Sequence, residues 1–102
     1  MARRYVLTRI VSEHPVTEEQ LGSALIATIR KGFGEIGLAR IGPKLIRFDS
    51  GKSLAVIACT SGMIDELQAA IGLMSGCGEQ PVASLVIQVS GTIKGLARRR
   101  RK

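Results

Sequence analysis

The sequence predicts an α+β sandwich, because segments typical of strands and helices follow one another in the order β-α-β-β-α-β. The strand segments are rich in β-branched residues and alternate in part, whereas the helical segments repeat apolar residues every three or four positions. This order is the split-βαβ arrangement, which predicts a ferredoxin-like, four-stranded antiparallel sheet with both helices on one face. A short basic C-terminal helix or tail is expected to follow the last strand.

The first strand and the first helix are expected within residues 5–32. Residues 5–11 place Val6, Thr8 and Ile10 on one face of a strand, and Tyr5, Leu7 and Arg9 on the other. The run Thr17-Glu18-Glu19-Gln20 has the form of a capping box, and Gly32 is expected to be the left-handed C-cap of the helix that follows. Residues 33–42, which contain three glycines, are predicted as a short helical turn or an irregular loop.

The second half of the chain is predicted to contain three further strands and a second helix. Residues 44–49 and 53–60 read as strands joined by a turn at Ser50-Gly51-Lys52. Thr60 or Ser61 can cap a helix that ends at Gly76-Cys77-Gly78, and its core-facing stripe comprises Ile64, Leu67, Ile71 and Met74. The last strand is predicted over 82–89, and residues 93–101 are predicted as a short basic helix.

The strand over residues 53–60 is apolar on both faces, which is unusual in an antiparallel sheet that exposes one face to water. The face away from the helices is therefore expected to be covered by the C-terminal helix, a partner or a second copy of the chain. A simple excess of aliphatic residues in a central strand explains the pattern equally well. The candidate partner-facing residues are Tyr5, Leu7, Leu54, Val56 and Ala58.

Length and charge indicate one domain with basic ends. The 102 residues carry a net charge of +7, and we divide them into a domain over 1–97 and a basic tail over 98–102. Because the excess charge lies at the two ends, we expect the protein to bind a polyanion such as RNA, although a solubilising or localisation tail is the alternative. The candidate RNA-binding residues are Arg3, Arg4, Arg9, Lys94, Arg98, Arg99, Arg100, Arg101 and Lys102.

Catalytic and metal-binding patterns are sparse, so we assign neither catalytic nor metal-ligating residues. His14 is the single histidine, and the two cysteines, Cys59 and Cys77, form no CxxC pair. The Gly-x-Gly-x-x-Gly match at residues 32–37 follows a helix and not a strand, which disfavours a phosphate-binding loop. No apolar run is long enough to span a bilayer and no signal peptide is evident, so we expect a cytoplasmic protein with reduced thiols.

Several short runs resemble those of one family. Arg4-Tyr5-Val6-Leu7 opens the first strand, and Phe33-Gly34 follows the first helix. The other runs are Lys44-Leu45-Ile46-Arg47-Phe48-Asp49, Ala69-Ala70-Ile71 and Val89-Ser90-Gly91-Thr92-Ile93-Lys94. In their order and spacing, from Arg4 to about Lys94, they resemble the small archaeal and eukaryotic ribonuclease P protein, called protein component 2 in archaea.

The resemblance implies a function that the composition does not show. It implies an archaeal, non-catalytic subunit of the ribonucleoprotein that removes 5′ leaders from precursor tRNA, with a fold like that of RNA-recognition domains. Catalysis would reside in the RNA and its bound magnesium, and the protein itself would bind no cofactor. The partners would be the ribonuclease P RNA, a TIM-barrel-like component 3 and a second copy in a two-plus-two complex, with precursor tRNA met indirectly. Ser90, Gly91 and Thr92 are family-like positions.

Two other classes share the predicted fold. An acylphosphatase would need a phosphate-binding loop with an arginine after the first strand and an asparagine downstream, but the segment here is Ser12-Glu13-His14-Pro15-Val16 and the chain has no asparagine. A ligand-binding regulatory module usually accompanies a larger enzyme. Turnover of an acyl phosphate would favour the first alternative, and thermal stabilisation by amino acids the second.

Overall fold

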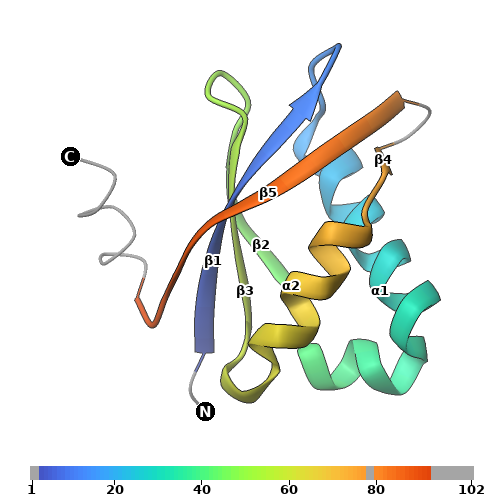
Figure 1. Ribbon diagram of the computed structural model, residues 1–102, viewed down its shortest axis with the longest axis vertical. Coiled ribbons are helices and arrows are strands. Elements are labelled where there is room, and N and C mark those ends of the chain that lie inside the picture. Colours follow the sequence, from blue (N-terminus) through green and yellow to red (C-terminus); the bar gives the residue numbers. More distant parts are fainter. Residues whose placement is uncertain (1–2, 78–79, 93–102) are drawn as a thin grey trace.

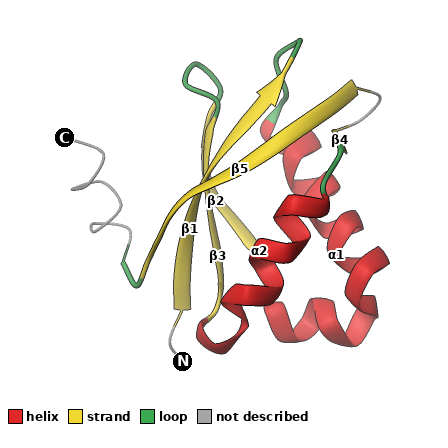
Figure 2. Ribbon diagram, in the orientation of Figure 1, coloured by secondary structure: helices red, strands yellow, loops and turns green. Residues whose placement is uncertain are grey.

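The computed structural model describes residues 3–77 and 80–92, which form one sheet covered by helices on one side (Figures 1 and 2). The strands are β1 (Arg3–Ser12), β2 (Lys44–Asp49), β3 (Leu54–Thr60), β4 (Gly76–Cys77) and β5 (Gln80–Ser90). The helices are α1 (Glu18–Ile41), the 3-10 turn η1 (Ser61–Met63) and α2 (Ile64–Leu73). Neither described α-helix combines the length and the hydropathy of a membrane span.

The sheet has the order β2-β3-β1-β5-β4, and all its pairings are antiparallel. Strands β1, β2, β3 and β5 with helices α1 and α2 form the ferredoxin-like arrangement, so the predicted fold class is confirmed. The two-residue strand β4 was not predicted. It lies where the second helix was expected to end, because α2 already stops at Leu73 and the chain turns back to pair with the start of β5.

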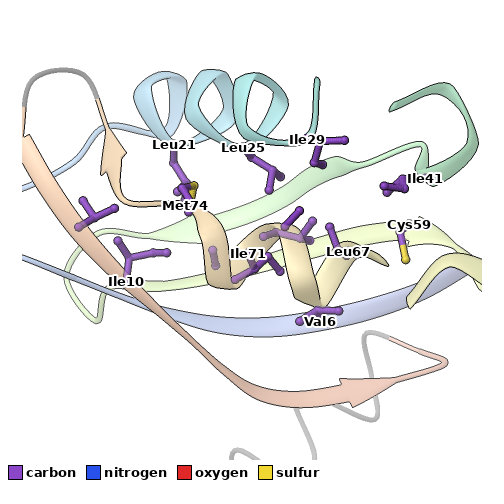
Figure 3. Packing of buried hydrophobic residues seen from close by; sticks show 14 of the residues in the cluster. Val6, Ile10, Leu21, Leu25, Ile29, Ile41, Cys59, Leu67, Ile71 and Met74 are labelled. Atoms are coloured by element: carbon purple, nitrogen blue, oxygen red, sulfur yellow. The ribbon is translucent and has the colours of Figure 1, made fainter. Parts of the chain in front are cut away.

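The main core fills the space between the sheet and the helices (Figure 3). Val6 and Ile10 of β1 and Ile57 of β3 are at most 2% exposed and meet the apolar faces of both helices. The predicted stripe of α2 points into this core, with Leu67, Ile71 and Met74 buried and Ile64 half-buried against them. Burial of these side chains fixes which face of the sheet the helices cover.

Helix α1 begins as predicted but extends further. The Thr17 side chain accepts a hydrogen bond from the Gln20 backbone N–H, and the Gln20 side chain accepts one from the Thr17 N–H, both at 3.1 Å. The first helical stretch breaks at Gly34, whose φ/ψ are non-helical, two residues after the predicted end at Gly32. A second helical stretch then continues to Ile41, in agreement with the short helical turn predicted within residues 33–42. The left-handed C-cap is Gly42, whose φ is 57°.

The start of α2 also differs from the prediction. Neither Thr60 nor Ser61 caps it with a side-chain hydrogen bond, because a 3-10 turn over Ser61–Met63 leads into the helix. The acids Asp65 and Glu66 lie in its first turn, near the positive end of the helix dipole, as their positions suggest. The predicted helix over 93–101 lies outside the described residues.

Two glycines of α1 provide a matched test of the bend. Gly34 has φ 75° and ψ −179°, a combination open essentially to glycine alone, whereas Gly22 is in regular helix and its added Cβ would meet nothing within 4 Å. We expect Gly34→Ala to lower the free energy of unfolding by about 1–3 kcal/mol. We expect Gly22→Ala to raise it by about 0.5–1 kcal/mol.

Urea titrations of the two variants would measure both changes. Stabilisation by Gly34→Ala would mean that the chain at this position accepts an ordinary helical conformation, so that the bend is not required.

Candidate nucleic-acid interface

The sheet face that points away from the helices is built by three neighbouring strands. In the register of β1 with β3, Tyr5 lies opposite Ala58, Leu7 opposite Val56 and Arg9 opposite Leu54. Because directly opposed residues of an antiparallel pair point to the same side, these six side chains share one face. We call this surface the open face. It contains all five residues predicted to face a partner.

The centre of the open face is aliphatic and closely packed. Leu7, Leu54 and Val56 are 4%, 7% and 9% exposed, and Tyr5 and Ile46 pack against them. Single-strand RNA readers of this fold stack bases on aromatic residues of the sheet. Here Tyr5 is the one aromatic residue in this described cluster, so the centre is suited to apolar packing and not to serial base stacking. Its occupation by a partner stays a prediction.

Cationic side chains surround this centre. Arg9, Lys44 and Arg47 are all exposed, and the register places Lys44 opposite Ala58 and Arg47 opposite Val56 on the open face. Lys44 and Arg47 are three positions apart, so a regular strand would put them on opposite faces. A β-bulge between Leu45 and Arg47 shifts the register and brings both to the same face. The sequence did not single out these two residues, because the excess of positive charge lies at the two ends of the chain.

The charges of the described chain are divided between the two layers. Helix α2 carries two acids and no base, and α1 carries three of each. The strands carry one acid, Asp49, and five bases, namely Arg3, Arg4, Arg9, Lys44 and Arg47. A polyanion is therefore attracted to the sheet layer more strongly than to the helix layer.

The predicted RNA-binding residues in β1 are placed in different environments. Arg9 is exposed, whereas Arg3 and Arg4 are half-buried. The guanidinium of Arg3 donates a 2.9 Å hydrogen bond to the Gly42 carbonyl, which fastens the start of β1 to the end of α1. Arg9 is thus free to meet a phosphate, while Arg3 has an internal structural contact. Lys94 and the tail over 98–102 lie outside the described residues.

The family-like positions lie at the end of β5. Ser90 pairs with Tyr5, which places it beside the open face. Its side-chain oxygen accepts a hydrogen bond from the Thr92 backbone N–H at 3.2 Å, which closes a turn around Gly91. These residues therefore continue the edge of the open face.

Catalytic groups do not gather in the part of the chain that the structure describes. In residues 3–77 and 80–92, no three His, Cys, Asp or Glu side chains lie together as metal ligands would. A groove of about 830 Å³ lies between α1 and the α2–β4 connection, and its charged lining residues are Glu19 and Lys31. The described lining includes no histidine and no second carboxylate, so it offers no acid–base pair of the kind that general acid–base catalysis uses.

The buried thiol of Cys59 lies opposite Arg4. Burial raises the pKa of the Cys59 thiol, and the charges of Arg3 and Arg4 oppose this rise in part. The thiol is therefore neutral at physiological pH and acts as a small apolar side chain in the core.

Solved structures show where this fold occurs. A chain in the cryo-EM structure of yeast ribonuclease MRP superposes with a TM-score of 0.71, at 15% identity, over 98% of this chain and 92% of that chain. At this identity the likeness shows the fold alone, an α+β sandwich that also occurs within a ribonucleoprotein.

Sequence relatives identify the family. The Rpp14/Pop5 family model matches residues 4–100, and this chain belongs to that family. Ribonuclease P protein component 2 of Pyrococcus furiosus is 28% identical, over 95% of this chain and 81% of that protein. The protein of the same name from Archaeoglobus fulgidus is 33% identical, over 95% of this chain and 86% of its own length. The resemblance inferred from the sequence is confirmed.

The Cys59 environment predicts a thiol that reacts slowly. In a Cys77→Ser background, we expect Cys59 of the native protein to react with iodoacetamide at pH 8 on the order of a hundredfold more slowly than in the unfolded chain, because modification requires an opening of the core. Mass spectrometry over a time course would measure the two rates. Equal rates would show that the thiol is accessible and that the packing around it is looser than described.

Proposed function

We propose that this chain is a protein subunit of ribonuclease P that supports RNA-catalysed removal of 5′ leaders from precursor tRNA. The observation that carries the proposal is the family match over residues 4–100, together with archaeal relatives named ribonuclease P protein component 2 that align over 95% of the chain. The cationic sheet layer supports it independently, because a subunit of a ribonucleoprotein must neutralise phosphates.

In this role the protein performs no bond chemistry. Arg9, Lys44 and Arg47 bind phosphates of the catalytic RNA, and this binding favours the active conformation of that RNA over its alternatives. The reaction itself is carried by the RNA and the magnesium that the RNA binds. The contacts to phosphates position the protein without reading the base sequence, which agrees with an open face that has one aromatic residue among its described central side chains.

The proposal includes protein partners. A TIM-barrel-like component 3 subunit and a second copy of this chain assemble with it in a two-plus-two complex in the cytoplasm. The apolar centre of the open face and the exposed aliphatic residues of β5 support protein contacts in addition to RNA contacts.

Reconstitution tests the function directly. Ribonuclease P RNA and the other protein subunits from the same source would be assembled with and without this chain, and cleavage of precursor tRNA would be followed at modest magnesium. We expect cleavage to require this chain, and we expect no cleavage from the proteins alone. Unchanged cleavage without this chain, in a mixture whose other subunits are active, would overturn the proposed function.

The cationic side chains of the open face predict the salt dependence of RNA binding. Each lost phosphate contact reduces the magnitude of the slope of log K against log salt by about 0.7–0.9. We therefore expect the double variant Arg9→Gln, Arg47→Gln to reduce it by about 1.4–1.8.

The matched control is Lys31→Gln, which removes one exposed positive charge from the helix layer, and its slope should stay close to that of the unaltered protein. Binding isotherms at several salt concentrations would measure all three slopes. A slope of the double variant equal to that of the unaltered protein would remove the open face from the RNA contact.

A further inference from the structure

The two edges of the sheet are protected very differently. Strand β2 forms one edge, and three of its six residues are charged, namely Lys44, Arg47 and Asp49. At the other edge, the eleven residues of β5 include no charged residue. Charged side chains are one device by which edge strands avoid pairing with other chains. The β2 edge has this protection and the β5 edge lacks it.

The backbone groups of β5 that face outward can be assigned from two hydrogen bonds. The Val82 N–H donates to the Ser75 carbonyl at 3.1 Å, on the side away from β1. Alternate residues of a strand direct their backbone N–H and C=O groups to the same edge. The backbone N–H and C=O groups of Ser84 and Val86 therefore also point outward. The backbone of Ile10 gives the same assignment. Its N–H donates a hydrogen bond to the Ser53 carbonyl at 2.8 Å, on the β3 side of β1. Ser84 lies opposite Ile10 in the register, so the Ile10 N–H does not bond to Ser84.

No strand among the described residues covers this part of the edge. Strand β4 pairs only with Gln80 and Pro81, at the beginning of β5. The register of β5 with β1 shifts at a bulge, where Ile87 has no partner in β1. The regular part of this edge is therefore limited to residues 82–86. The outward N–H and C=O groups of Ser84 and Val86 are therefore available as a short template for another strand.

The side chains along this edge are apolar and exposed. Leu85, Val86 and Ile87 are 58%, 38% and 46% exposed, although they are consecutive residues of one strand. Exposure of these aliphatic side chains to water is unfavourable, and a neighbouring aliphatic strand would bury parts of all three. Because β5 has no charged residue, it has no cationic side chain to attract RNA phosphates.

We infer that residues 82–86 of β5 are a strand-addition site for an extended, uncharged, aliphatic segment of another protein subunit. The inference rests on the proposed function, since it needs a complex with further protein subunits. The added strand pairs with the backbone of Ser84 and Val86, and its side chains pack beside Leu85. Three side chains cannot bury the roughly 1,200 Å² that a stable interface needs, so this partner also contacts the chain elsewhere.

A matched pair of substitutions tests the site. Val86→Lys places a charge on the free edge, whereas Val11→Lys places the same charge on a 50% exposed valine of β1, whose register partner is Ala83 of β5 and which therefore lies away from that edge. The other ribonuclease P protein subunits of the same source would be titrated singly against each variant. We expect Val86→Lys to weaken binding of one subunit about tenfold or more, because the lysine ammonium would be desolvated beside an aliphatic strand. We expect a change below about threefold for Val11→Lys.

A second measurement needs no variant. Hydrogen exchange of the unaltered chain should be fast at the Ser84 and Val86 amides, and these two should slow when the same subunit is added. The Ala83 and Leu85 amides, which face β1, should change little.

The outcomes separate the possible occupants. Unaltered subunit binding by Val86→Lys, with no new protection at Ser84 and Val86, would overturn the inference and leave the proposed function intact. Protection of the Ser84 and Val86 amides that grows with the concentration of this chain alone would assign the edge to a second copy. Protection of these amides by RNA alone would assign the edge to RNA. Either result would overturn the inference. If the unaltered chain binds none of the subunits and gives no stimulation of cleavage, the proposed function fails first, and the inference fails with it.

Discussion

The central position of β1 is the constraint on which the rest of the structure depends. It pairs with β3 along residues 3–9 and with β5 along residues 5–12, so its backbone is hydrogen-bonded on both sides. Its alternation then decides the two faces of the whole sheet. Val6 and Ile10 require the helices on one side, while Leu7 and Arg9 define the open face on the other. A shift of one residue would reverse both faces, because side chains alternate with a period of two.

The alternation of β1 is also why the fold class could be predicted from the sequence. The apolar stripe of α2 and the capping box at Thr17 follow simple local periods, and both are found where the sequence places them. The length of α1 could not be predicted in this way. Gly34 and Gly42 interrupt and end the helix, as glycines predict, but burial of Ile41 and the packing of Leu38 against the core add a helical stretch beyond Gly34. Tertiary packing thus overrides the local preference of Gly32 and Gly37, which are helical.

The candidate site was predicted less completely, because the charge excess pointed to the chain ends and because two bulges break the regular alternation of the strands. Tyr5, Leu7, Leu54, Val56 and Ala58 follow the regular alternation and fall together on the open face as expected. Lys44 and Arg47 join that face only because β2 contains an extra residue, and Ile87 marks the corresponding irregularity in β5. An interpretation that assumes regular alternation of side chains along a strand places such residues on the wrong face. Arg3 is a different case, because its hydrogen bond to Gly42 depends on the end of α1, which the sequence placed elsewhere.

The uneven distribution of charge along the sheet, between the charged β2 and the uncharged β5, gives the two proposed kinds of contact different physical properties. The proposed contacts of Arg9, Lys44 and Arg47 with phosphates would depend on counterion release, so salt would weaken them steeply. A strand added at Ser84 and Val86 is held by backbone hydrogen bonds and aliphatic burial, which salt screens little. In a ribonucleoprotein, raising the salt concentration should therefore separate this chain from RNA before it separates the chain from a protein bound at β5. The chain would then leave the RNA together with that protein, because the contact at the β5 edge depends little on salt.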